Sequence, residues 1–235
     1  MEQQQRSVGD VLRRIPFFAE LGEASLAALA RQVRTRRYSA GKTVVADGWP
    51  CEGLSFVVRG HVRVYRSTSD GREQVLRVVG PGRTFNEAAA FDEGLNAEGA
   101  VAVDEVVTGL VPSLVLRAEI DRHPEIAKAA TRLLANRQRA LGQMVEDLGT
   151  RDVTARVAKV LLGCAGRYDH VVDGAPGACS RITHQEIASM VGSVREVVQR
   201  SLKELEREGA IKLERAHIKI VSIGTLERFS EGSGD

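Results

Sequence analysis

The sequence predicts an α+β fold in three parts: an N-terminal antiparallel β-roll, one long helix, and a C-terminal pair of short helices with a β-hairpin. Three observations predict this fold. Short alternating apolar segments occupy residues 38–115, apolar side chains recur in 4-3-4-3-4 steps over residues 130–148, and a capped pair of helical segments spans residues 183–208. We therefore expect domains at residues 1–116, 117–150 and 151–235.

Composition and charge exclude several classes of protein. With 43% apolar and 4% aromatic residues, the 235-residue chain is typical of a globular protein and has too few rings for stacking on single-stranded nucleic acid. No apolar run approaches the roughly 20 residues of a membrane helix, and the first residues lack a secretory apolar region, so we expect a cytoplasmic protein without a membrane partner. The formal net charge of +2 neither demands nor excludes a nucleic-acid partner.

The three cysteines, Cys51, Cys164 and Cys179, are odd in number and widely spaced. This count excludes a disulfide framework and a four-thiolate metal site within one chain. We expect each cysteine to be a small buried or surface residue, and we expect no metal site.

The first part of the chain changes from helical to strand-like patterning. Residues 16–34 carry apolar side chains at helical spacing, whereas residues 54–58, 62–65 and 75–79 alternate as short strands do. Several short strands at this spacing predict an antiparallel roll, because a parallel sheet needs long crossovers between its strands. The turns are expected at Asp47-Gly48, Arg59-Gly60, Asp70-Gly71, Gly80-Pro81-Gly82 and Glu93-Gly94.

A long helix is expected to follow, because Pro124 suits a first helical turn and no further proline occurs until Pro176. Its apolar spacing is that of a two-stranded coiled coil, which predicts a homodimer; the alternative is a face that packs on the chain's own sheet. Arg137 interrupts the apolar series, so it either reaches out of the dimer or points into the roll. The expected interface residues are Ala130, Leu134, Leu141, Met144 and Leu148.

The last third predicts a winged helix-turn-helix. A helix from Val153 to about Tyr168 leads through a loop at residues 173–177, and Thr183 with Glu186 then forms a capping box. Helices are expected at residues 184–191 and 194–208, with Gly192 at the turn, Ser193 as a second cap, and Gly209 at the end. Residues 211–213 and 217–221 alternate as a small hairpin, and residues 230–235 are expected to fray.

The second helix of this unit exposes four polar side chains on one face: Arg195, Glu196, Gln199 and Arg200. A guanidinium can bond guanine O6 and N7, and a carboxylate can accept from cytosine N4. This face therefore predicts the reading of G/C base pairs in double-stranded DNA. The alternative is a solvated helix face with an arginine–glutamate ion pair.

The segment ITHQEIASMVGSVREVVQR at residues 182–200 resembles the DNA-binding signature of the Crp/Fnr superfamily of bacterial transcription regulators. GLSFVVRG at residues 53–60 resembles the family's cyclic-nucleotide-type β-roll, and DVTARVA at residues 152–158 resembles the start of its DNA domain. The resemblance implies a homodimer that is controlled allosterically through the β-roll. It also implies RNA polymerase as a partner.

The resemblance also assigns roles to residues. Arg195, Glu196 and Arg200 match the base-reading positions of the cAMP-receptor branch, which implies pseudo-palindromic DNA with TGTGA-like halves. Val194 replaces the usual serine or threonine, so one phosphate contact is expected to be missing. The remaining expected DNA-binding residues are Gln199 and Ser193, with Thr183 and Gln185 on phosphates.

The family's cAMP cassette is altered here. The arginine that neutralises the cyclic phosphate falls on Ala97, its hydroxyl neighbour falls on Glu98, and the hydroxyl pair that holds adenine falls on residues 141–142. A carboxylate repels a phosphodiester, so we expect an effector other than cAMP. The expected effector pocket comprises Asn86, Glu87, Ala88, Ala97, Glu98, Leu134, Arg137 and Leu141.

Several alternatives stay open at this point. A haem-based sensor of NO, CO or redox state needs an axial ligand, for which His61, Cys51 and His123 are the candidates. The family's CO-sensing haem positions are Asn86 and Ala88 here, and the N-terminal cluster cysteines of Fnr are absent. A small-molecule effector, a regulator without a ligand and a regulatory module acting on a protein partner are the other readings, whereas no catalytic motif indicates an enzyme.

Overall fold

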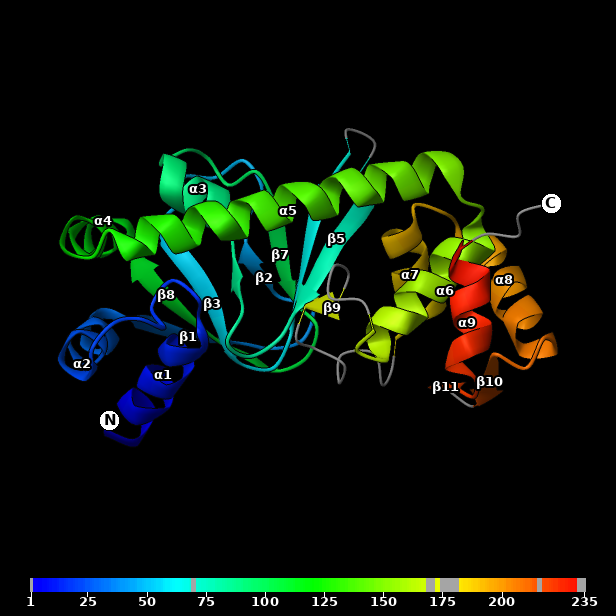
Figure 1. Cartoon of the computed structure of the whole chain (residues 1–235), viewed down its shortest axis with the longest axis horizontal. Helices are drawn as coiled ribbons and strands as arrows, with labels where there is room; N and C mark the ends of the chain where they lie inside the picture. The colour runs from blue at the N-terminus through cyan, green and yellow to red at the C-terminus, as the bar shows by residue number, and fades with distance from the viewer. Residues whose placement is uncertain (1, 69–70, 168–171, 174–181, 215–216, 232–235) are drawn as a thin grey trace. The chain divides into compact units, whose positions relative to one another are not determined.

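The computed structural model describes residues 2–68, 71–167, 172–173, 182–214 and 217–231, and it confirms the α+β class (Figure 1). The chain separates into two compact units. The first unit comprises Met1–Arg66 with Val79–Arg139, and the second comprises Ser67–Val78 with Ala140–Asp235. The expectations on Asp70, Tyr168, Cys179 and residues 174–177 and 232–235 fall outside the described residues.

The first unit is built around an antiparallel roll, as the strand spacing predicts. One sheet has the order β1-β8-β3-β6, formed by β1 (Arg34–Tyr38), β8 (Val106–Pro112), β3 (Gly53–Arg59) and β6 (Thr84–Phe85). In the other sheet, β7 (Gly99–Ala102) pairs antiparallel with both β2 (Thr43–Val45) and β4 (Val62–Ser67). Gly60 turns the chain between β3 and β4 with φ +81°, and a Cβ there would lie 2.5 Å from the Glu105 carbonyl oxygen.

Helices α1 (Glu2–Arg14), α2 (Glu23–Gln32), α3 (Glu87–Asp92) and α4 (Ser113–Arg122) accompany the roll. Helix α1 was not expected from the sequence, and its Val8, Val11 and Leu12 are buried. The helical spacing of residues 16–34 produces a helix only from Glu23. The core of this unit includes Phe17, whose ring meets that of Phe91 edge to face at 5.3 Å.

The long helix α5 (Glu125–Thr150) begins directly after Pro124. The expected range 117–150 therefore also contains the end of α4, and His123 and Pro124 separate the two helices. The helix continues from the first unit into the second.

The second unit contains the winged helix-turn-helix, which confirms the prediction. It comprises α6 (Val153–Cys164), α7 (His184–Val191), α8 (Arg195–Arg207), the antiparallel pair β10 (Ile211–Glu214) and β11 (His217–Ile220), and α9 (Ile223–Glu231). Strand β5 (Glu73–Val79), most of which clusters with this unit, neighbours β9 (Val172–Asp173). The expected fraying at Ser230 is wrong, because this residue is buried at the end of α9.

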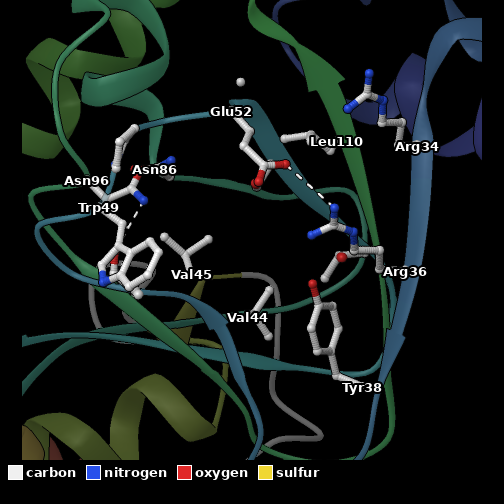
Figure 2. A pocket seen from close by; sticks show the side chains of 15 residues that line it. Arg34, Arg36, Tyr38, Val44, Val45, Trp49, Glu52, Asn86, Asn96 and Leu110 are labelled. Atoms are coloured by element: carbon white, nitrogen blue, oxygen red, sulfur yellow. Dashed lines mark hydrogen bonds and ion pairs between the residues drawn. The ribbon is translucent and has the colours of Figure 1, made fainter.

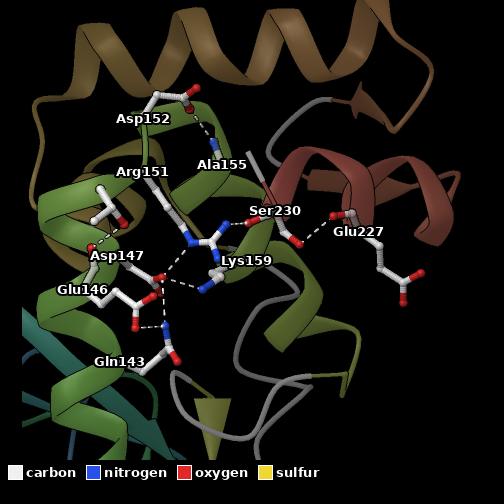
Figure 3. A network of polar contacts seen from close by, with 10 residues as sticks. Gln143, Glu146, Asp147, Arg151, Asp152, Ala155, Lys159, Glu227 and Ser230 are labelled. Atoms are coloured by element: carbon white, nitrogen blue, oxygen red, sulfur yellow. Dashed lines mark hydrogen bonds and ion pairs between the residues drawn. The ribbon is translucent and has the colours of Figure 1, made fainter. Parts of the chain in front are cut away.

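A polar network joins the end of α5 to α6 and α9 (Figure 3). The carboxylate of Asp147 accepts hydrogen bonds from Arg151 Nε at 2.8 Å and from Lys159 Nζ at 2.5 Å. Arg151 also donates to the carbonyl of Ser230. Asp152 caps α6 by accepting from the Ala155 amide at 2.8 Å. These contacts fix where the second unit's helices begin after α5.

Two further findings concern the expectations from composition. Cys164 is disulfide-bonded, so the expectation that the cysteine count excludes disulfide bonding within the chain is wrong. No helix in the described part of the chain is long and apolar enough to span a membrane.

Candidate nucleic-acid interface and effector position

Helix α7 begins with the capping box that the sequence predicts. The Thr183 hydroxyl accepts from the Glu186 amide at 3.2 Å, and the Glu186 carboxylate accepts from the Thr183 amide at 2.7 Å. Two amides that the first turn of a helix leaves without partners are thereby satisfied. The helix therefore starts at a fixed residue.

The turn between α7 and α8 is fixed by side chains as well as by its own backbone. Gly192 has φ +61°, in the left-handed region that glycine tolerates. The carbonyl of Met190 accepts from Gln74 Nε2 at 3.0 Å, and the carbonyl of Val191 accepts from Arg156 at 2.6 Å. These bonds satisfy carbonyls that the end of α7 would otherwise leave unpaired.

Ser193 does not cap α8, contrary to expectation. Val194 occupies the N-cap position, is more than half exposed, and provides no side-chain hydrogen bond. The first turn of α8 therefore keeps amides that no capping side chain satisfies, and a helix N-terminus of this kind attracts anions.

One side of α8 anchors it to the unit. Val198, Leu202 and Leu205 are fully buried. The Thr154 hydroxyl on α6 lies 3.0 Å from the Ser201 hydroxyl and 3.0 Å from the Glu204 carboxylate, both on α8. The opposite side of α8 is thus held at the surface.

That opposite side carries Arg195, Glu196, Gln199 and Arg200, which we call the reading face. All four residues are exposed. Within the described part of the chain none of them makes a side-chain hydrogen bond or ion pair, so the alternative of an internal arginine–glutamate pair does not form there. Donors and an acceptor that are presented together on an exposed helix can pair with base edges.

The other residues expected at DNA, Gln185, Thr183 and Ser193, differ in exposure and in the hydrogen bonds they already make. Gln185 is exposed on the first turn of α7. Thr183 is exposed too, but its hydroxyl donates to the Glu186 carboxylate at 2.8 Å. The hydroxyl hydrogen is therefore not free to bond a phosphate in this structure. Ser193 is half-buried, and its amide donates to the Ala188 carbonyl at 3.0 Å.

The candidate effector position in the first unit is organised by Glu87. This residue is 3% exposed, and its carboxylate accepts from the Thr84 hydroxyl at 2.8 Å and from Arg137 at 3.3 Å. Arg137 therefore points into the roll, which was one of its two expected directions. Asn86 precedes α3 with φ +66° and is buried.

The other expected pocket residues differ in exposure. Ala88 and Ala97 are exposed, and Glu98 and Leu134 are half-buried. Leu141 is 43% exposed and belongs to the second unit.

The three candidate haem ligands each have another partner. The Cys51 sulfur accepts from Asn86 Nδ2 at 3.2 Å, and burial raises the pKa of the Cys51 thiol, which disfavours a thiolate ligand. His61 Nδ1 lies 2.6 Å from Asp104, and His123 Nδ1 lies 3.2 Å from Glu125. Among the described residues, no group of three or more histidine, cysteine and acidic side chains could hold a metal ion.

The expected dimer residues on α5 differ in exposure. Ala130 is 4% exposed and lies in the core of its own unit, so it offers little surface to a second copy. Leu134 and Met144 are half-buried, whereas Leu141 and Leu148 are exposed. Val145, which sequence reasoning missed, is 70% exposed one turn beyond Leu141.

Comparisons with known proteins match both units. Residues 35–123 match the cyclic nucleotide-binding domain family, and residues 155–229 match the Crp-like helix-turn-helix domain family. The chain is 34% identical over 221 residues to a CRP-like cAMP-activated global transcriptional regulator of Mycobacterium tuberculosis, covering 94% of this chain and 97% of that protein. It is also 34% identical to the cAMP-activated regulator Vfr of Pseudomonas aeruginosa, covering 75% of this chain and 84% of Vfr.

Solved structures agree with the fold. A Crp/Fnr-family structure from Eubacterium rectale has a TM-score of 0.72 and 22% identity, and it covers 94% of this chain and 100% of that one. A CRP-family transcriptional regulator from Thermus thermophilus has a TM-score of 0.66 and 28% identity, covering 85% of this chain and 98% of that one.

Proposed function

Because this chain belongs to the Crp/Fnr superfamily of transcription regulators, we propose that it acts as a homodimer on pseudo-palindromic DNA with TGTGA-like half-sites. One observation carries this proposal: the reading face on α8 presents two guanidiniums, one carboxylate and one amide, all exposed and all without a partner among the described residues. This set has the chemistry that reads guanine and cytosine edges in the major groove.

The three expected parts then take separate roles. Residues 1–116 would sense an effector, the helix within residues 117–150 would hold the dimer, and residues 151–235 would bind DNA. RNA polymerase is the expected protein partner in the cytoplasm, and regulation rather than catalysis is the expected activity. An effector would act by shifting the population of two arrangements of the dimer.

We also propose that the effector is not cAMP, although the relatives compared above are named as cAMP-activated. At the cassette positions that would neutralise and hold the cyclic phosphate, this chain has Ala97 and Glu98. An alanine supplies no charge, and a carboxylate repels a phosphodiester. Arg137 pairs with Glu87, so this cation already has a carboxylate partner.

The experiment that tests DNA reading is a fluorescence-anisotropy titration of a duplex with two TGTGA-like half-sites and of a scrambled duplex of equal length. We expect the specific duplex to bind at least about a thousand-fold more tightly at a fixed salt concentration. Equal affinity for both duplexes would contradict base reading.

The effector proposal has its own readout. Addition of millimolar cAMP should leave the affinity for the specific duplex unchanged, and a cAMP-induced rise of tenfold or more, about 1.4 kcal/mol, would overturn the proposal.

An absorption spectrum of the purified protein decides the haem alternative, because a bound haem gives a Soret band.

A further inference from the structure

A cavity of about 160 Å³ lies in the first unit, beside strands β1, β2 and β8 (Figure 2). It shares only Asn86 with the effector position described above. Its wall combines cationic side chains from β1 with apolar side chains from β2 and the following loop, so it offers both charge and an apolar surface.

The cationic part of the wall comes from alternate residues of β1. Arg34 and Arg36 share one face of the strand and are both exposed. Arg36 lies 3.7 Å from Glu52, which is an ion pair but too long for a hydrogen bond. The Arg34 side chain has no hydrogen bond or ion pair with another described residue. Two positive charges and one negative charge therefore favour a monoanion.

Asn96 provides an independent sign of a ligand. It lines the cavity, is 6% exposed, and donates from Nδ2 to the Ala46 carbonyl at 3.1 Å. Because a carbonyl only accepts, this bond fixes which end of the amide is the oxygen. That oxygen is buried and has no hydrogen-bond partner among the residues that the structure describes. A buried acceptor of this kind is stabilised by a ligand that brings a donor.

The size of the cavity limits the ligand. About 160 Å³ is comparable to the roughly 150 Å³ of an apolar cavity that holds a single benzene ring. Val44, Val45 and Trp49 provide apolar surface for such a ring.

We propose that this cavity binds a small organic carboxylate of about one ring in size that carries a hydroxyl or N–H donor. The carboxylate pairs with Arg34 and Arg36, the donor bonds the Asn96 side-chain oxygen, and the ring lies against Trp49 and the two valines. Binding here does not depend on DNA recognition and can be measured without DNA.

Trp49 makes the test direct, because it is the chain's single tryptophan and it lies at the cavity. Titration of the full-length protein with 4-hydroxybenzoate, followed by tryptophan fluorescence and by calorimetry, should give saturable binding of one ligand per chain. Benzoate lacks the donor and phenol lacks the carboxylate, so each should bind about tenfold or more weakly.

Matched variants locate the binding. Arg34→Gln and Arg36→Gln should each weaken 4-hydroxybenzoate by about tenfold, because each removes one cation from the wall. Arg37→Gln is the control, since Arg37 is the exposed neighbour that lies outside the cavity wall. The affinity of this variant for 4-hydroxybenzoate should equal that of the wild type. The absence of saturable binding, an equal loss in Arg37→Gln, or competition by inorganic phosphate at an equal concentration would each overturn the proposal.

Discussion

Arg200 gives the sharpest test at the scale of single residues, because its side chain is exposed and has no partner within the described part of the chain. Arg200→Ala should cost about 1–3 kcal/mol on the specific duplex and relax the preference at one base pair. Competition titrations with duplexes substituted at each position measure both effects. Arg207→Ala is the control, since Arg207 is exposed at the other end of α8 and should change affinity little. An equal loss on scrambled DNA would show that Arg200 contacts phosphates only.

Arg137 is the second residue that a single substitution can test, through its ion pair with Glu87. Its removal takes a cationic partner away from the nearly buried carboxylate of Glu87, so Arg137→Met should destabilise the first unit by about 2–4 kcal/mol. The double variant with Glu87→Gln should recover more than half of this loss, because the buried charge is then removed. Urea unfolding followed by circular dichroism measures both. Simple additivity of the two substitutions would mean that the pair is not coupled.

Several residue-level features could be read from the sequence, and others could not. The alternation of apolar and polar side chains on α8 placed the reading face on the surface, because helical periodicity is a local property. The direction of Arg137 was left open, since its partner Glu87 is 50 residues away in the sequence. The cap at Ser193 failed because α8 begins one residue later than a serine cap would require.

At the scale of elements, the capping box determines where α7 begins. Thr183→Ala removes the acceptor for the Glu186 amide, so α7 should lose about 1 kcal/mol of local stability. Native-state hydrogen exchange of the amides in the first turn of α7 measures this loss. Thr131→Ala is a suitable control, because the Thr131 hydroxyl bonds back to the Ala127 carbonyl within α5 and alanine is the better helix former. Unchanged protection of the α7 amides would contradict the role of the cap.

Gly192 determines the turn between α7 and α8. Alanine at this position would adopt a left-handed conformation, and its Cβ would lie 2.9 Å from Leu148 Cδ2. We therefore expect Gly192→Ala to cost about 1–3 kcal/mol and to weaken DNA binding by displacing α8. Gly142→Ala is the matched control, since nothing lies within 4 Å of a Cβ there, and helix propensity predicts a gain of about 1 kcal/mol. Thermal unfolding measures the melting temperatures of the two variants. Equal melting temperatures for Gly192→Ala and Gly142→Ala would contradict backbone strain at residue 192.

The elements that the sequence predicted are those with strong local signals. Glycine turns and alternation predicted β3, β4 and β5, and the capping box predicted the start of α7. Helix α1 was missed because its apolar residues begin only at Val8, after a polar stretch. The expected range 117–150 merged the end of α4 with α5, although Pro124 disfavours a helical conformation at His123 and so marks the break between the two helices.

At the scale of the whole molecule, contacts distant in sequence are what local patterns fail to predict. Residues 67–78 cluster with the second unit, and Gln74 bonds the Met190 carbonyl across 116 positions of sequence. No periodicity in either segment signals that contact. The 4-3 repeat on α5, in contrast, is a local pattern, and its exposed part predicts contact with a second chain.

That prediction concerns the apolar surface that the chain leaves exposed on α5. Leu141 and Val145 lie one turn apart and are 43% and 70% exposed, so they form an apolar pair at the surface of a single chain. Burial against a second copy of α5 would remove this surface from water and would pair the two reading faces for DNA half-sites about 34 Å apart. The expected assembly therefore has twice the 25.5 kDa mass of the chain.

Val145→Glu places a carboxylate in this exposed apolar pair, where two symmetry-related charges would meet across the dimer contact. We expect it to dissociate the dimer and to weaken binding to the two-half-site duplex about a hundred-fold or more, because each half-site is then bound separately. Sedimentation equilibrium measures the mass, and anisotropy at the same protein concentration measures the affinity. Asn136→Glu is the control, because position 136 lies nine residues away on the opposite, exposed face of α5, and it should remain dimeric. A wild-type protein that sediments as a monomer while it binds the palindromic duplex tightly would contradict dimer formation through Leu141 and Val145, and with it the pairing of the two reading faces.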